Sequence, residues 1–162
     1  MEKRVSEVMN TEVVTVLPDM TMPDLQRLFA QKRFGAVPVM DRERNLMGIV
    51  SRSDVVRKFS LEQTMAELVN GDFDAALGVE DNDDALSSIS AAVGIRLSKV
   101  KASDIMISDV VTIAPDATLS EAADFMVERR IHRLPVLEKG RLVGIISAFD
   151  FMRLYAANKS TS

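Results

Sequence analysis

The segment GIVSRSD, residues 48–54, recurs as GIISAFD at residues 144–150. In each copy a glycine and two β-branched residues precede a serine, and an aspartate follows three positions after that serine. The apolar half is typical of a buried strand, whereas Ser-x-x-Asp is typical of the first turn of a helix. A pattern of this length, found twice, predicts that the chain contains two copies of one structural unit.

The repeat extends beyond these seven residues. The stretch MNTEVVTVLPDMT (9–21) aligns with MISDVVTIAPDAT (106–118), and FGAVPV (34–39) aligns with IHRLPV (131–136), both at an offset of 97 residues. The offset falls to 96 at the repeated glycine, so the first copy is one residue longer in the charged stretch before it. Length variation of this kind is typical of a surface turn between two strands.

Each copy predicts the order strand, helix, strand, strand, helix. The β-branched runs VVTV (13–16) and VVTI (110–113) predict first strands, each closed by a Pro-Asp turn. The pairs AVPVM with LMGIVS, and RLPVL with LVGIIS, predict the two later strands of each copy as a hairpin. The last helix is predicted to begin near Asp54 in the first copy and near Asp150 in the second.

The helix after each first strand has its own start signal. Thr118 and Glu121 match a capping box, and Thr21 with Asp24 is a weaker version that carries Pro23 in the first turn. Apolar residues at helical spacing follow and predict the face of each helix that packs into a core. These residues are Leu25, Leu28 and Phe29 in the first copy and Ala122, Phe125 and Met126 in the second.

Together these patterns predict an α+β fold of two β-α-β-β-α repeats packed with pseudo-twofold symmetry. One such unit alone would leave much apolar surface exposed, and packing two units together would bury it. We expect the first repeat at residues 1–59, an acidic helical insert at 60–101, the second repeat at 102–156 and a disordered tail at 157–162.

The insert is expected to contain two short helices, because an unstructured loop of its length is uncommon in a compact domain. LEQTMAELV and DALSSISAAVGI have helical apolar spacing and flank the acidic stretch GDFDAALGVEDNDD (71–84). The aspartates of this stretch do not follow the spacing of an EF-hand loop. We therefore expect them to serve a helix N-terminus and solubility rather than a metal ion.

The composition excludes several classes of function. The chain of 162 residues has a net charge of −4 and no cysteine, so nucleic-acid binding, disulfides and thiol chemistry are not expected. It has one histidine and no phosphate-cradling GxxxxGK[ST] motif, so we expect a protein that is not an enzyme. The first residues have no apolar stretch of signal-peptide length, and no long apolar run follows, which predicts a cytoplasmic protein without membrane attachment.

The repeated motifs resemble the cystathionine β-synthase (CBS) domain, and two copies resemble the CBS pair, also called the Bateman module. The resemblance covers residues 5–58 and 102–155. It implies that clefts between the repeats bind an adenosine nucleotide or another adenosyl ligand, and that this binding regulates an enzyme, transporter or channel. It also implies that two pairs associate into a homodimeric disk.

The glycines and aspartates of the repeated segment are the first candidates for such a site. Gly48 and Gly144 would let a planar base approach the strand backbone closely. A carboxylate in the first turn of a helix can accept hydrogen bonds from both hydroxyls of a ribose, so Asp54 and Asp150 are ribose candidates. The alternative is helix capping, because Ser-x-x-Asp also matches a capping box.

Hydroxyl side chains complete the predicted sites. Ser51 and Ser147 offer a hydroxyl beside the free N–H groups of a helix start, which is a favourable place for phosphate, and they can also cap the helix. The family resemblance implies that Thr15 and Thr112 line the base or phosphate cleft. Arg52 is either a source of positive charge for phosphate or a surface residue.

The two sites are expected to differ. The second repeat has His132 and Arg133 at the positions where the first has Gly35 and Ala36. The His-Arg pair resembles nucleotide sites in the γ subunit of AMP-activated protein kinase, where such residues contact phosphate. Arginine offers a permanently charged fork and histidine can gain a proton beside an anion, although a solvated basic turn is the alternative. We expect the site of Asp150 to bind AMP, ADP or ATP more tightly.

The predicted function is a regulatory, energy-sensing module that binds an adenosine nucleotide and uses no catalytic cofactor. Because no output domain follows the second repeat, the response is expected to reach a separate effector protein. S-adenosylmethionine or NAD is the alternative ligand. An interaction or assembly module with vestigial nucleotide sites is the alternative function.

Overall fold

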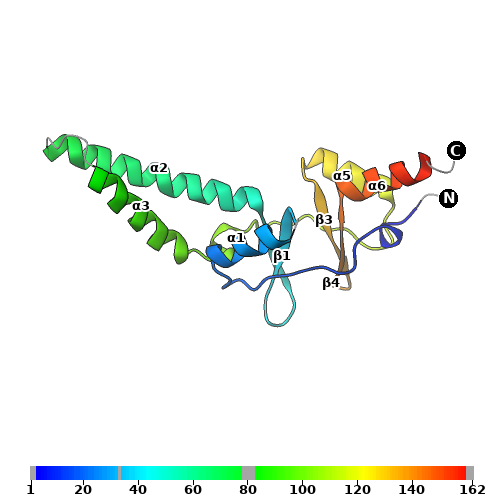
Figure 1. Ribbon diagram of the computed structural model, residues 1–162. Coiled ribbons are helices and arrows are strands. Elements are labelled where there is room, and N and C mark those ends of the chain that lie inside the picture. The colour runs from blue at the N-terminus through cyan, green and yellow to red at the C-terminus, as the bar shows by residue number, and fades with distance from the viewer. Residues whose placement is uncertain (1–2, 33, 78–82, 160–162) are drawn as a thin grey trace. The chain divides into compact units, whose positions relative to one another are not determined.

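The computed structural model of the protein describes residues 3–32, 34–77 and 83–159, and their side chains outside residues 69–90 and 158–159. The elements in Figure 1 are the 3₁₀ turn η1 (Val5–Glu7), the strands β1 (Ala36–Met40), β2 (Leu46–Ser51), β3 (Arg133–Glu138) and β4 (Arg141–Ser147), and the helices α1 (Met22–Gln31), α2 (Arg52–Leu77), α3 (Asp83–Ser98), α4 (Ala102–Ile105), α5 (Leu119–Glu128) and α6 (Ala148–Lys159). The strands form two sheets, β1–β2 and β3–β4. No helix in the described part of the chain is long and apolar enough to cross a membrane.

Packing divides the chain into two compact units. The first-repeat unit consists of Val16–Val39 and Gly48–Ile107, and the second-repeat unit consists of Met1–Thr15, Met40–Met47 and Ser108–Ser162. Each unit therefore contains most of one repeat. It also contains the leading segment of the other repeat, that is, the residues with which the other repeat begins in the sequence.

Hydrogen bonds and burial show how these leading segments are exchanged. In the second-repeat unit the N–H of Val5 donates to the carbonyl of Ala117 (2.9 Å), and Val5 is fully buried. In the first-repeat unit the N–H of Ala102 donates to the carbonyl of Met20 (2.8 Å), and Ala102 is fully buried. The predicted domain boundaries follow the order of the chain and missed this exchange, because no local pattern shows which repeat a leading segment packs against.

The first strand predicted in each repeat is reduced to a single residue pair. Val16 and Ile113 each form one isolated parallel bridge, and the rest of VVTV and VVTI is not strand. The N–H groups of Val16 and Ile113 donate to the carbonyls of Pro38 (3.0 Å) and Pro135 (3.1 Å). A proline has no N–H to donate back, so the ladder cannot extend through it. The prediction of full first strands is therefore wrong.

The hairpin predicted from RLPVL and LVGIIS is confirmed. β3 and β4 pair Glu138 with Arg141 and leave Lys139 and Gly140 as a two-residue turn. Lys139 and Gly140 have φ angles of 49° and 79°, the positive values that match a tight turn to the twist of its strands. The charged stretch before Gly144 is thus the surface turn that the shift in repeat offset predicted.

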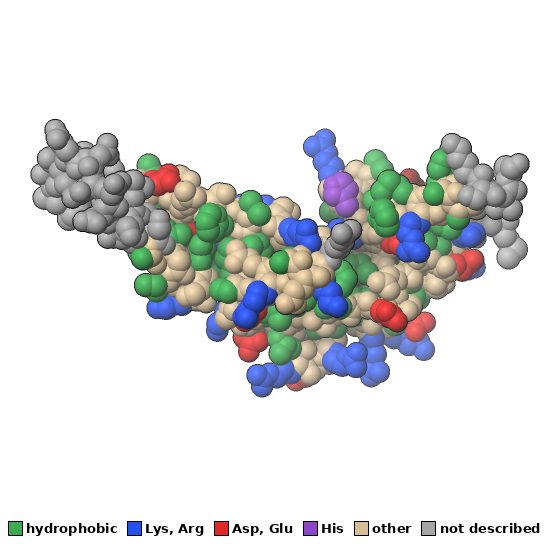
Figure 2. Space-filling view, viewed as in Figure 1, with side chains coloured by type: hydrophobic (Ala, Val, Ile, Leu, Met, Phe, Trp, Pro, Cys, Tyr) green, Lys and Arg blue, Asp and Glu red, His purple; other side chains and the backbone are tan. Residues whose placement is uncertain are grey.

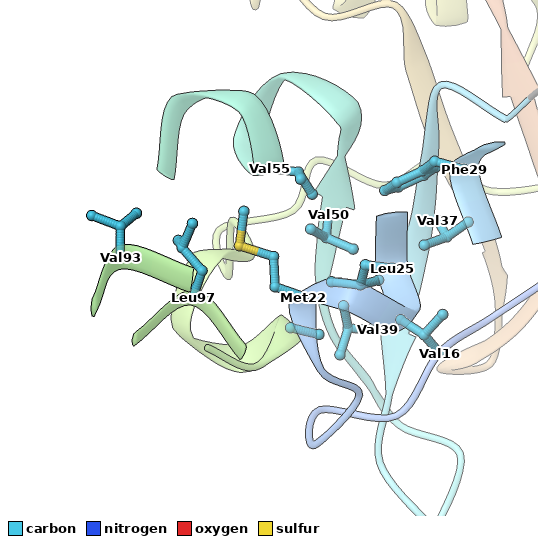
Figure 3. Packing of buried hydrophobic residues seen from close by; sticks show 11 residues of the cluster. Val16, Met22, Leu25, Phe29, Val37, Val39, Val50, Val55, Val93 and Leu97 are labelled. Carbon is cyan, nitrogen blue, oxygen red and sulfur yellow. The ribbon is translucent and has the colours of Figure 1, made fainter. Parts of the chain in front are cut away.

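The core of the first-repeat unit collects apolar side chains from α1, α2, α3, β1 and β2, which point toward one another in Figure 3. Leu25 and Phe29, predicted to face the core, are buried in this cluster. In the second-repeat unit Ala122 and Met126 are buried as predicted, whereas Phe125 is exposed. Phe125 lies at the edge of the apolar face of α5, so the helical pattern alone assigned it wrongly.

Helix α5 begins with the predicted capping box. The hydroxyl of Thr118 accepts a hydrogen bond from the N–H of Glu121 (3.2 Å), and the carboxylate of Glu121 accepts one from the N–H of Thr118 (2.8 Å). The backbone N–H and then the hydroxyl of Thr118 lower the pKa of Glu121. At α1 the hydroxyl of Thr21 donates to Asp24 (2.6 Å) and accepts no bond from the helix backbone.

This difference between the two caps predicts a difference in stability. Thr118→Ala should lower the free energy of unfolding by about 1 kcal/mol, because it removes the acceptor for a helix N–H. Thr21→Ala, the matched control, should cost less because its hydroxyl caps no N–H. Urea denaturation followed by circular dichroism measures both variants. Equal losses in the two variants would show that the hydrogen bond from the N–H of Glu121 to Thr118 adds nothing to the free energy of unfolding.

The predicted insert is helical, but its first helix is not separate. α2 runs from the end of β2 to Leu77, so the predicted boundary at residue 59 lies inside it. No glycine or proline interrupts the chain between Arg52 and Asn70, and the helix formers of LEQTMAEL continue the helix. α3 joins the same unit by burying Val93 and Leu97. The acidic side chains of residues 71–84 lie outside those that the structure describes.

The C-terminal helix is also longer than predicted. α6 runs to Lys159, so residues 157–159 are helical where a disordered tail was expected. Residues 160–162 of that predicted tail lie outside the described part of the chain.

Candidate ligand-binding site

Ser51 and Asp54 form the helix cap that was the alternative to ligand binding. Ser51 ends β2, and its N–H and hydroxyl donate to Oδ2 of Asp54 (2.8 and 2.5 Å). The N–H of Asp54 donates back to the hydroxyl of Ser51 (3.3 Å). The other oxygen, Oδ1, is paired with the guanidinium of Arg57. Both oxygens of Asp54, a residue only 4% exposed, are therefore used within the chain.

The second copy repeats the two bonds from the serine to the carboxylate and leaves the carboxylate less occupied. The N–H and hydroxyl of Ser147 donate to Oδ2 of Asp150 (2.8 and 2.7 Å), and Asp150 is half-buried. Within the described residues, no group donates a hydrogen bond to Oδ1 of Asp150. An ionised carboxylate accepts up to about four hydrogen bonds. Both aspartates thus accept the N–H of the serine that precedes their helix, and Oδ1 of Asp150 keeps the capacity to accept further hydrogen bonds.

Two basic residues lie at the same end of the β3–β4 hairpin as Asp150. In the antiparallel register Arg133 is paired directly with Ser147. The N–H of Ala148, the first residue of α6, donates to the carbonyl of His132 (2.9 Å). The fold therefore brings His132, Arg133, Ser147 and Asp150 together around the start of α6 within one unit.

The basic residues differ in their surroundings. The side chain of His132 is exposed, and because the chain has one histidine it is the purple group at the surface in Figure 2. Arg133 is half-buried, and this burial lowers the pKa of its guanidinium. Burial disfavours a cation, and an anionic group bound nearby offsets that cost. A role for His132 and Arg133 in holding phosphate stays a prediction.

The sequence profile of the CBS domain matches residues 5–61 and 102–157, which is most of the chain. The protein belongs to the CBS domain family. Its two matched regions make it a tandem CBS pair, or Bateman module, as the repeated motifs predicted.

Other CBS proteins share the sequence pattern and the fold. The uncharacterized protein MJ1426 of Methanocaldococcus jannaschii is 28% identical over 157 residues, which cover 91% of this chain and 88% of the relative. The CBS domain pair of protein MJ0100, solved in complex with 5′-methylthioadenosine and S-adenosyl-L-methionine, is 16% identical with a TM-score of 0.69, covering 98% of this chain and 99% of that one. CBSX2, solved in complex with AMP, is 22% identical with a TM-score of 0.67, covering 96% and 98%.

The repeated glycines of this CBS pair have a different role from the one predicted. A Cβ atom on Gly48 would lie 2.7 Å from the Sδ of Met106, and one on Gly144 would lie 2.5 Å from the Sδ of Met9. These methionines belong to the exchanged leading segments, which pair with the strand beside each glycine. The close approach over the glycines is therefore made by the chain itself, and the prediction that they admit a base is wrong.

Thr15, Thr112 and Arg52 are the remaining residues that the sequence offered as ligand contacts. The hydroxyls of Thr15, which is exposed, and Thr112, which is half-buried, make no hydrogen bond within the described residues, and their place in a cleft stays a prediction. The guanidinium of Arg52 donates to the carbonyls of Phe29 (2.5 Å) and Lys32 (3.1 Å). Arg52 thus caps the C-terminal end of α1, a role that neither interpretation of its sequence position included.

Sequence reasoning missed Arg57, which pairs with Asp54. A signal for it exists, because an arginine follows the aspartate by three positions in both repeats, at Arg57 and Arg153. Residues three apart on a helix are neighbours, so either arginine has the reach to meet its aspartate. No group of three or more potential metal ligands occurs among the side chains that the structure describes.

Proposed function

We propose that this CBS pair is a regulatory module that binds an adenosine nucleotide at the second-repeat site and acts on a separate effector protein. The observation that carries the proposal is the grouping of four predicted site residues around the start of α6, namely His132, Arg133, Ser147 and Asp150. This group supplies a carboxylate for ribose hydroxyls and two basic side chains for phosphate.

Ligands in CBS pairs of the same fold support an adenosyl ligand. MJ0100 was solved with 5′-methylthioadenosine and S-adenosyl-L-methionine, and CBSX2 with AMP. All three ligands carry the adenosine ribose, so a carboxylate that accepts from its hydroxyls suits each of them. Only AMP among them carries phosphate, and His132 with Arg133 therefore favours AMP, ADP or ATP for this chain over S-adenosylmethionine.

Thermal melts of the purified chain with AMP, ADP, ATP, NAD and S-adenosylmethionine test the proposal. A ligand present at 100 times its dissociation constant stabilises the fold by about 2.7 kcal/mol. For a chain of this length that corresponds to a rise in Tm of roughly 5–10 °C. We expect AMP, ADP or ATP to give the largest rise, and a larger rise with S-adenosylmethionine would change the proposed ligand.

The alternative, an assembly module with vestigial sites, has one observation in its favour. Both carboxylate oxygens of Asp54 are bonded to residues of the chain itself, so the first-repeat site has little capacity left to bond a ligand. If none of the five ligands raises the Tm, the second-repeat site is vestigial as well and the assembly module becomes the better answer.

The homodimer stays a prediction with some structural support. Three large apolar side chains of α6 are exposed at a spacing of three residues: Phe149, Met152 and Tyr155. Residues at this spacing share a helix face, and exposed apolar faces of this kind mark protein–protein contacts. The face on α6 is therefore available to a second copy of the chain or to an effector.

A further inference from the structure

We propose that Arg57 closes the first-repeat site by occupying the oxygen of Asp54 that would otherwise accept from a ribose. The CBS pair would then bind nucleotide at its second-repeat site only. This inference rests on the proposed function, and it adds a residue that decides how many sites the chain offers.

The geometry of the ion pair carries the proposal. Asp54 is 4% exposed, and its Oδ2 is held by the N–H and hydroxyl of Ser51. Its Oδ1 is paired with Arg57, whose side chain is 69% exposed. The guanidinium thus takes an acceptor position on Oδ1 of an otherwise buried carboxylate, and a ribose hydroxyl that bonds to Oδ1 must compete with it.

The second repeat shows the open arrangement. Arg153 follows Asp150 by three positions, as Arg57 follows Asp54. Within the part of the chain that the structure describes, Arg153 forms no ion pair, and Oδ1 of Asp150 accepts no hydrogen bond. The same sequence spacing therefore gives an aspartate paired with arginine in the first repeat and an aspartate without that pair in the second.

The first repeat also lacks compensating contacts for a nucleotide that displaces Arg57. It has Gly35 and Ala36 where the second repeat has its basic pair. The guanidinium of Arg52 is already bonded to two carbonyls at the end of α1. An entering nucleotide would exchange one charge-assisted bond for another and gain no phosphate contact from these positions, so binding there is weak.

The test is calorimetric titration of the full chain with AMP, ADP and ATP, comparing the wild type with Arg57→Gln and Arg153→Gln. Glutamine forms helix as well as arginine, and Arg57 is mostly exposed, so both variants should fold, which circular dichroism checks. We expect one site in the wild type and in Arg153→Gln. We expect Arg57→Gln to gain a second site, with first-repeat affinity raised about ten-fold or more.

A double variant and the wild type show whether a contrary result contradicts this inference alone or the proposed function as well. In Arg57→Gln with Asp54→Asn the gained site should be lost, because the uncovered carboxylate is gone. Two equal sites in the wild type, one site in Arg57→Gln, or weaker binding in Arg57→Gln would each overturn the inference while leaving the proposed function intact. If no variant binds any of the three nucleotides, the proposed function fails and the inference falls with it.

Discussion

Asp150→Asn should weaken AMP binding by about 10- to 150-fold, because charge-assisted hydrogen bonds contribute about 1.5–3 kcal/mol each. Asparagine keeps the size of the side chain and an oxygen that can still accept from the N–H of Ser147, so the start of α6 should remain capped. What the substitution removes is the negative charge on the oxygen proposed to face the ribose. Calorimetric titration with AMP measures the loss.

Asp54→Asn is the matched control for this variant. Asp54 has the same place in the repeated motif, but its carboxylate is bonded to Ser51 and Arg57. Its replacement should lower the melting temperature of the free protein and leave the AMP affinity unchanged. Equal losses of affinity in the two variants would contradict the inequality of the sites. An unchanged affinity in Asp150→Asn would show that its carboxylate only caps the helix.

Local patterns predicted those parts of the fold that local forces determine. The capping box at Thr118, the hairpin turn at Gly140 and the start of α6 beside Asp150 each depend on residues close in sequence, and each is confirmed. The exchange of the leading segments depends on contacts between residues about a hundred positions apart, such as Val5 with Ala117. Two similar repeats offer such a segment two similar partners, so the pattern could not choose between them.

The candidate site shows the same division. The sequence predicted the β3–β4 hairpin and the start of α6, which bring four of the candidate residues near one another, and the role of these residues in binding stays a prediction. It could not predict which aspartate keeps an open oxygen, because Arg57 and Arg153 have identical spacing. The two aspartates also differ in burial, which is a tertiary property that sequence spacing does not show. Asp54 is buried, whereas Asp150 is half-buried.

Gly48→Ala should lower the free energy of unfolding by about 3 kcal/mol, the upper part of the range for overpacking a well-packed site. The added Cβ would lie 2.7 Å from the Sδ of Met106 and 2.8 Å from the carbonyl oxygen of Ile107. A methionine side chain can move aside, but Ile107 is held by two backbone hydrogen bonds with Ile49 (3.0 and 2.9 Å). Making room therefore requires these bonds to break or the strand to shift.

Alanine substitutions at two other glycines show whether the loss of stability comes from this contact or from any replacement of glycine by alanine. At Gly144 the nearest backbone atom, the carbonyl oxygen of Asn10, lies at 3.2 Å, and the closer atoms belong to the flexible side chain of Met9. Gly144→Ala should therefore cost less than Gly48→Ala. Gly94 lies in α3 with nothing within 4 Å of its added Cβ, so Gly94→Ala should stabilise the protein by about 0.5–1 kcal/mol. Urea denaturation ranks the three variants by their free energy of unfolding. If Gly48→Ala is as stable as Gly144→Ala, the segment at Ile107 moves aside without breaking its hydrogen bonds to Ile49.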